Sequence, residues 1–370
     1  MSVLASAILI SSSILFGTIS QAQPKLEADF GYVEGRIKDI IASSKHDGHS
    51  TALVQLRSGH VVRAEIPRVD QFTPKDLPPF KEGQRVELYY SYGTDGQHQF
   101  VVSDWVRRPS LFWLIGIFLL VSIVVARFKG FRAFLSTAAS LLIVVAFIIP
   151  QILAGWNPIV VSLVGVGSIL ILAIYFVHGL NWSTTAALAG TLAAVLMTMA
   201  LGIAFTEWSY LTGFGSDEAL MINAGANQIN LKGLLLAGLL IGALGALTDI
   251  TIVQASVIRE LAHVNPELTA RELYQRGMNV GRDHVGSLVN TLVLAYTGAS
   301  LPLLLLLTLN DFSFARALNI ELVATEIIQI LVGSVGLVLS VPITTYIAAL
   351  LFRGDRLPIQ PSELNHQHHH

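Results

Sequence analysis

The sequence predicts a polytopic α-helical membrane protein with seven transmembrane helices and a small N-terminal extracytoplasmic antiparallel β domain, an OB-like barrel. Only 13% of the 370 residues are charged and 53% are hydrophobic, whereas a soluble globular protein carries about 25% charged residues. Uncharged runs of about 20 residues, long enough to cross a bilayer as a helix, recur from residue 111 onward. Residues 24–107 instead contain short groups of Val, Ile and Tyr between turn signals, which is typical of strands.

Both ends of the chain carry a recognisable pattern. Residues 1–22 are apolar and rich in serine, and they end in Ser20-Gln21-Ala22, which predicts a cleaved secretory signal peptide. The positively charged segment that usually opens such a peptide is missing, so an uncleaved signal anchor is the alternative. Residues 354–370 are predicted to be a cytoplasmic tail. The closing segment His366–His370 resembles a purification tag and carries no argument about metals.

Turn signals divide the predicted β domain, residues 24–107, into strands. Arg57-Ser58-Gly59 separates the strand-like segments 52–56 and 60–66, and residues 93–97 form a second turn signal further along. Four to five short strands indicate a small antiparallel barrel or sandwich, with the OB fold as the favoured type. No nucleic-acid partner follows, because fold does not determine function and the net charge of −2 indicates no basic surface.

Residues 110–353 form the predicted transmembrane domain. The seven predicted helices cover about residues 111–126, 131–153, 158–177, 183–206, 231–258, 284–308 and 320–351. Each is long and apolar enough to be read as one membrane crossing, so the lipid bilayer is the first predicted partner.

The basic residues between these helices predict the orientation. On one side the loops contain Arg127, Lys129, Arg132, Arg259, Arg271, Arg276, Arg282, Arg353 and Arg356, and on the other only Lys232 and Arg316. Basic residues accumulate in cytoplasmic loops. We therefore expect a multi-pass protein of the bacterial inner (cytoplasmic) membrane, with the β domain outside and the C-terminus in the cytoplasm.

An acidic residue interrupts the glycine-rich helix predicted over 231–258. Its predicted packing positions are Gly238, Gly242 and Gly245, which share one face with Asp249. Small residues let another helix approach closely, so this face is expected to bring Asp249 against a neighbour. Asp249 precedes Arg259 by ten residues, or roughly 15 Å of helix, and an ionisable group at that depth is by default a functional candidate. Neutral, protonated packing is the alternative.

The next predicted span carries a polar stripe. Its members are Asp283, Ser287, Asn290, Thr291 and Thr297, which recur at helical spacing. The connection between the two spans is cytoplasmic in the predicted topology, so the spans are antiparallel, and Asn290 and Thr291 are expected at the depth of Asp249. Such polar residues often only hold membrane helices together, which is the alternative for the stripe. For Asp283 the alternative is a position at the membrane interface.

The connection itself is predicted to be helical. Thr269 and Glu272 have the spacing of a capping box, which predicts a helix beginning at Ala270. We expect this helix to lie on the cytoplasmic membrane surface, with Gly277 and Gly281 turning the chain into the next span.

Motifs of soluble chemistry are missing from the sequence. There is no phosphate loop, no Gly-x-Ser-x-Gly elbow, no His-Glu-x-x-His and no cysteine. The histidines at 46, 49, 60 and 98 lack the spacing of metal ligands. We therefore expect no cofactor, no metal site and no enzymatic activity. An intramembrane enzyme that uses Asp249 with Asp283 is the least favoured hypothesis.

Several segments resemble those of a known family. They are Ile241–Ala246 followed by Asp249, then Asn265–Leu268, Asn279–Asp283 and Asn290–Pro302. In combination these segments resemble the YibE/F family of bacterial multi-pass membrane proteins. A fainter likeness relates Gly238–Pro302 to SecD/SecF-type exporters and implies proton-coupled outward movement of a substrate.

Two classes of function follow as expectations. The first is a transporter or exporter that is coupled to protons or other ions through Asp249 and moves an unknown small substrate. Because the sequence places only this acid deep in a span, a complete pathway requires a second copy of the chain, as in a homo-oligomer, or another subunit. The second is an envelope assembly or accessory protein whose outer β domain binds a protein partner.

Overall fold

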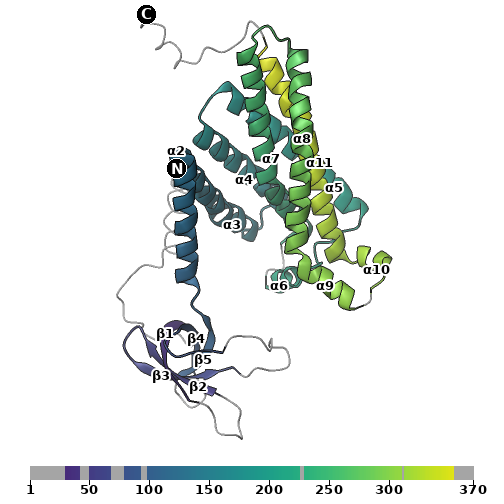
Figure 1. Ribbon diagram of the computed structural model, residues 1–370. Helices are drawn as coiled ribbons and strands as arrows, with labels where there is room; N and C mark the ends of the chain where they lie inside the picture. Colours follow the sequence, from purple (N-terminus) through teal and green to yellow (C-terminus); the bar gives the residue numbers. More distant parts are fainter. Residues whose placement is uncertain are drawn as a thin grey trace, which may run out of the picture. The chain divides into compact units, whose positions relative to one another are not determined.

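The computed structural model describes residues 30–41, 50–67, 79–92, 98–225, 229–310 and 312–353 (Figure 1). The chain divides into two compact units, residues 1–121 and 122–370, which are described separately. The predicted signal segment 1–22, the turn at 93–97 and the tail 354–370 lie outside the described residues.

The first unit contains a closed five-stranded barrel with the strand order β1-β2-β3-β5-β4. The strands are β1 (Phe30–Ile41), β2 (Ser50–Leu56), β3 (Val61–Ile66), β4 (Arg85–Tyr92) and β5 (His98–Trp105). All neighbouring pairs are antiparallel except β3 with β5, which is parallel. One parallel pair is unavoidable, because an odd number of strands cannot alternate in direction all the way around a closed ring.

The predicted hairpin at Arg57-Ser58-Gly59 is confirmed. The amide of Leu56 donates to the carbonyl of His60 at 2.9 Å, and Gly59 adopts φ +88°, a conformation that glycine reaches without strain. Along β2 the side chains of Ala52, Val54 and Leu56 point into the barrel, where they are at most 6% exposed. This alternation is the period of two that a strand with one buried face requires.

The second unit is helical and begins within α2. The helices are α2 (Arg108–Ile143), η1 (Val144–Ile148), α3 (Ile149–Leu153), α4 (Pro158–Ile171), η2 (Leu172–Phe176), α5 (Trp182–Trp208), α6 (Asp217–Gly225), α7 (Leu231–Val264), α8 (Ala270–Ala299), α9 (Leu301–Leu309), α10 (Phe314–Leu318) and α11 (Glu321–Leu351). Helix α7 contacts α4, α5, α8 and α11 (Figure 1). Helices α7, α5 and α11 supply most of the buried apolar core.

Five helices in the described part of the chain are long and apolar enough to cross a membrane, or six if the bent pair α8 and α9 counts as one span. The difference from the predicted seven arises mainly at residues 108–153, which form one helical run of 46 residues. This run is interrupted at Arg127, whose φ of 53° and ψ of −134° are not helical. A Cβ added at Gly130 would overlap the carbonyl oxygen of Ser122. In a straight helix these two residues lie about 12 Å apart, so the chain folds back sharply at this break.

The predicted surface helix at 270–278 is wrong, although its start is confirmed. Thr269 and Glu272 form the capping box, but α8 then runs without a turn to Ala299. Gly277 and Gly281 are buried inside α8, where an added Cβ would clash with Ile258 and Val341. These glycines therefore serve close packing against α7 and α11. The chain bends later, by 59° between α8 and α9.

The loop after α5 is tied to the starts of two helices. The carboxylate of Glu321 accepts bonds from the amides of Thr212 and Gly213, both at 2.7 Å. Gly213 has φ +85°, and a Cβ there would come within 2.6 Å of the carbonyl oxygen of Leu231. Only glycine satisfies both constraints.

Gly213→Ala is therefore expected to lower stability by about 2 kcal/mol or more, through backbone strain and this clash. Gly155 is a matched control, because it has φ +86° but no atom within 4 Å of an added Cβ. Gly155→Ala should therefore lower stability only through the backbone strain of a positive φ. The melting temperatures of the purified variants in detergent measure the difference, and equal losses would show that the clash has no effect.

Candidate functional site

Asp249 lies on an exposed face of α7 together with three glycines. We call Gly238, Gly242, Gly245 and Asp249 the glycine strip, and all four are exposed. Among the glycines only Gly242 contacts another helix, because a Cβ there would overlap the hydroxyl of Tyr296 on α8. Around Gly238 and Gly245 nothing lies within 4 Å of an added Cβ. The strip is therefore an open surface of the described chain along most of its length.

The predicted polar stripe of α8 is also exposed. Asp283, Ser287, Asn290 and Thr291 all face outward, whereas Thr297 is half-buried. Thr291 donates to the carbonyl of Ser287 at 3.0 Å, and none of these side chains bonds to Asp249 in the described structure. Two contacts show which residues of α7 lie opposite which residues of α8, namely Gln254 with Gly277 (2.8 Å) and Gly242 with Tyr296. By interpolation between them, Asp249 lies opposite the part of α8 near Ser287, and Asn290 and Thr291 lie about one turn closer to the end of α8.

The structure adds a second acid within a span, Glu326 on α11. Glu326 lines a cavity of about 300 Å³ between the segment 213–222, the start of α7 and the start of α11. It also lines a neighbouring cavity of about 240 Å³ that Thr297 and Ser300 border. Glu326 was not among the predicted site residues. The sequence does carry a signal, because Glu326 and Gln329 stand one helical turn apart in the apolar run 320–351. They are close to the start of that run, where polar residues are typical of the membrane interface.

Tyr296 connects Glu326 to the glycine strip. Its hydroxyl lies against Gly242, and the Glu326 carboxylate acts electrostatically on it. Gly238 and Glu326 line the same cavity. Because Asp249 follows Gly238 by eleven residues, the two acids differ in depth by about 16 Å.

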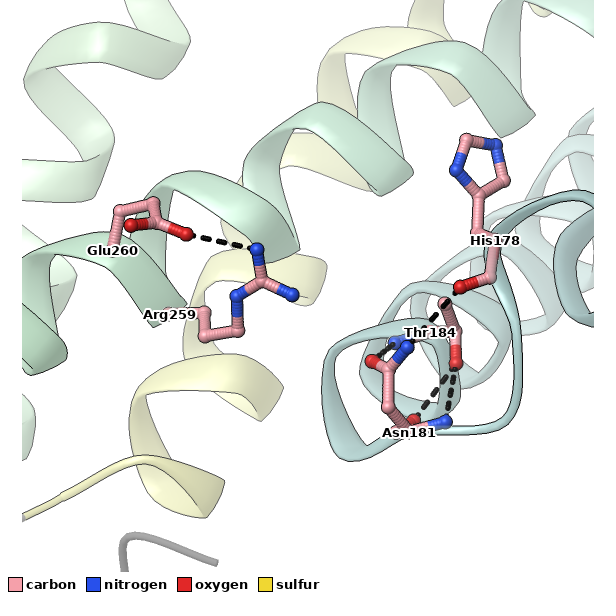
Figure 2. A network of polar contacts seen from close by, with 5 residues as sticks. All are labelled: His178, Asn181, Thr184, Arg259 and Glu260. Carbon is pink, nitrogen blue, oxygen red and sulfur yellow. Dashed lines mark hydrogen bonds and ion pairs between the residues drawn. The ribbon is translucent and has the colours of Figure 1, made fainter. Parts of the chain in front are cut away.

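Asp249 has a histidine neighbour toward the opposite end of the bundle. Its charge interacts with His178, in the connection between η2 and α5. Partial desolvation and the nearby Lys129 ammonium lower the pKa of His178 below its ordinary value, and the Asp249 charge opposes this shift. His178 lines a cavity of about 130 Å³ together with Asn181, Thr184 and Arg259 (Figure 2). Glu326 therefore lines cavities itself, whereas Asp249 interacts with a histidine that lines one.

Metal coordination finds no support in this region. The described residues contain no group of three or more His, Cys, Asp or Glu side chains placed to hold a metal ion. Asp249 and Glu326 lie at different levels of the bundle.

Comparison with known families identifies the helical unit. The profile of the YibE/F-like protein family matches residues 114–354. The chain belongs to the YibE/F-like family. The matched region contains Asp249, the α8 stripe and Glu326, so the whole site lies within it. No curated protein and no solved structure gave a match.

Proposed function

We propose that this YibE/F-like protein is an ion-coupled membrane transporter in which Asp249 and Glu326 are successive protonation sites. The observation that carries the proposal is the pair of carboxylates at two levels of one bundle, with Glu326 lining a cavity and Asp249 on the open glycine strip, where it interacts with His178. Ionisable side chains inside membrane spans are costly and are typical of proton relays and ion pathways. A purely anchoring bundle needs neither acid.

The surface between the two acids suits a polar route. It combines the glycine strip, which presents backbone without side chains, with Asn290, Thr291 and Tyr296 of α8. The separation of about 16 Å is too long for direct proton transfer. The route therefore depends on water or substrate between the acids, or on movement of α8 past the strip.

The topology belongs to the same proposal. A straight helix of 46 residues would measure about 69 Å, more than twice the hydrocarbon thickness of about 30 Å. We infer that the break at Arg127 makes two crossings of residues 108–153 and that α8 with α9 forms one bent crossing, which gives seven. With the basic loops inside, the barrel is extracytoplasmic and Glu326 lies in the outer half of the membrane. The likeness of Gly238–Pro302 to SecD/SecF-type exporters agrees with outward transport.

A second role is favoured by the barrel. Its strand order and single parallel pair agree with an OB-like type. A cavity of about 450 Å³ on it is lined by Arg36, Arg57, Arg85 and Glu34. Glu34 pairs with Arg57 at 2.6 Å, so the lining keeps a net positive charge, which suits an acidic envelope partner. Deleting residues 28–105 separates the roles, because transport by the helices survives the deletion whereas capture of a partner by the barrel is lost.

Proton flux tests the transporter. Full-length protein is reconstituted into vesicles that contain a pH-sensitive dye, and a potassium diffusion potential drives proton entry. Asp249→Asn and Glu326→Gln are each expected to reduce the protein-dependent proton flux at least tenfold, since neither amide side chain binds a proton near neutral pH. Glu267→Gln, at an exposed acid in the α7–α8 connection, is the control and should match the unmodified protein. Full flux in both test variants would refute the role of the two acids.

A further inference from the structure

The small cavity at the His178 end has features that the transport proposal does not use. It lies between Lys129, the start of α5 and the last turns of α7. Its lining residues are Lys129, His178, Asn181, Ser183, Thr184, Ala187, Ile252, Ser256 and Arg259. Seven of these nine side chains are polar or charged, which is unusual beside membrane helices.

The charge of this cavity is positive. Lys129 and Arg259 line it, and no carboxylate does. Lys129 has no ion-pair partner in the described part of the chain. Arg259 bonds through Nη2 to Glu260 at 2.8 Å, and Figure 2 shows Glu260 on the opposite side of Arg259 from Asn181 and Thr184. The nearest intramembrane acid, Asp249, interacts with His178 but does not line the cavity.

Ser183 opens its hydroxyl onto the cavity. Ser183 is only 3% exposed, yet it forms no hydrogen bond with any described residue. Some buried hydroxyls of the described bundle donate to the carbonyl four residues earlier, as Thr191 and Thr198 do at 2.8 Å, whereas others have no partner. The Ser183 hydroxyl faces the cavity, so it can donate a hydrogen bond to a group bound there. Ser256, across the cavity on α7, is also unbonded within the described structure.

The first turn of α5 adds amide donors. Asn181 caps the helix by accepting from the Thr184 amide at 3.0 Å, which leaves the amides of Trp182 and Ser183 without intrahelical partners. The start of a helix of 27 residues also carries partial positive charge. Amides and cations around one hydroxyl that faces the cavity form a suitable environment for an anion.

We infer that this cavity binds a phosphate-type oxyanion, with Lys129, Arg259 and Ser183 as its ligands. The volume of about 130 Å³ is well below the roughly 300–1,000 Å³ of sites for drug-sized ligands, but it exceeds several waters of about 30 Å³ each. It therefore fits one tetrahedral group. In the proposed topology the cavity lies at the cytoplasmic membrane surface, where basic pockets between helices bind anionic headgroups. The same chemistry suits free phosphate.

The test uses full-length protein in a neutral detergent and two probes, inorganic phosphate and phosphatidylglycerol. Phosphate binding is followed by the intrinsic fluorescence of the protein, to which Trp182, the residue before Ser183, contributes as one of five tryptophans. Lipid binding is followed by native mass spectrometry against phosphatidylcholine. Lys129→Gln and Ser183→Ala are the test variants. Arg271→Gln, an exposed basic residue at the start of α8, removes one charge away from the cavity and serves as the control.

We expect at least one probe to bind. Each test variant should weaken the binding of that probe about tenfold or more, as the loss of a hydrogen bond to a charged group predicts. Arg271→Gln should change this binding less than twofold. Binding of phosphatidylglycerol alone identifies a lipid site, and binding of phosphate alone identifies a soluble anion. Absence of binding by both probes would overturn the inference. Equal weakening by Arg271→Gln would overturn it too, since it would indicate general charge attraction. Neither result depends on proton flux.

Discussion

A cysteine at Ser287 is expected to react with a membrane-impermeant thiol reagent from the cytoplasmic side, and a cysteine at Gln329 from the outer side. The chain contains no cysteine, so each single substitution carries the only thiol. Ser287 is exposed at the level of Asp249, and Gln329 lines the cavity that reaches Glu326. Because thiols react as thiolates in water, labelling reports hydration, and the effect is all or none.

Leu331→Cys is the matched control for this labelling. Leu331 is on α11 two residues after Gln329, and it is 57% exposed. In a bilayer its exposed apolar face contacts lipid, so its thiol should not react from either side. Labelling is compared in right-side-out and inside-out vesicles. Reaction of Ser287→Cys from the outer side only would contradict the proposed topology. Unreactive thiols at both test positions would contradict the proposed hydrated route.

Gly190→Val should prevent the helical unit from folding. A Cβ at Gly190 would overlap the Thr344 hydroxyl and come within 3.0 Å of the Thr344 Cα, so backbone on α11 would have to move away from α5. Overpacking typically costs 1–3 kcal/mol, and contact with backbone places this site at or above about 3 kcal/mol. We expect little protein of correct size in the membrane and an early melting transition.

Gly167→Val is the control for this substitution. Gly167 is on α4, with nothing within 4 Å of an added Cβ, so the substitution meets no clash there, and the helix propensity of valine is no worse than that of glycine. Fluorescence-detected size-exclusion profiles and melting curves compare the two variants. A monodisperse Gly190→Val protein with unchanged melting would show that α5 and α11 are not packed as described.

Much of the fold was predictable because local patterns determine it. The Arg57–Gly59 hairpin and the Thr269–Glu272 capping box each depend on a few neighbouring residues, and both are confirmed. Gly277 and Gly281 were assigned to a turn because glycine ends helices as readily as it allows close packing. The contacts that decide between these roles come from Ile258 and Val341 on other helices, which local sequence does not reveal.

The site was predictable in part. Asp249 and the α8 stripe could be located from periodicity, but their exposure depends on which faces the neighbouring helices cover. Glu326 was missed because depth depends on where α11 begins relative to the bundle. The Lys129–Arg259 cavity was missed for a similar reason, since it joins three segments far apart in sequence.

Gly245 gives the most direct test of the proposed route. Gly245→Cys places one thiol between the two acids on the open part of the glycine strip, in a protein without other cysteines. Proton flux is measured in vesicles containing this variant before and after a thiol reagent is added. The transporter account predicts that flux stops after labelling and that the unmodified protein is unaffected. Unchanged flux through fully labelled protein would contradict it.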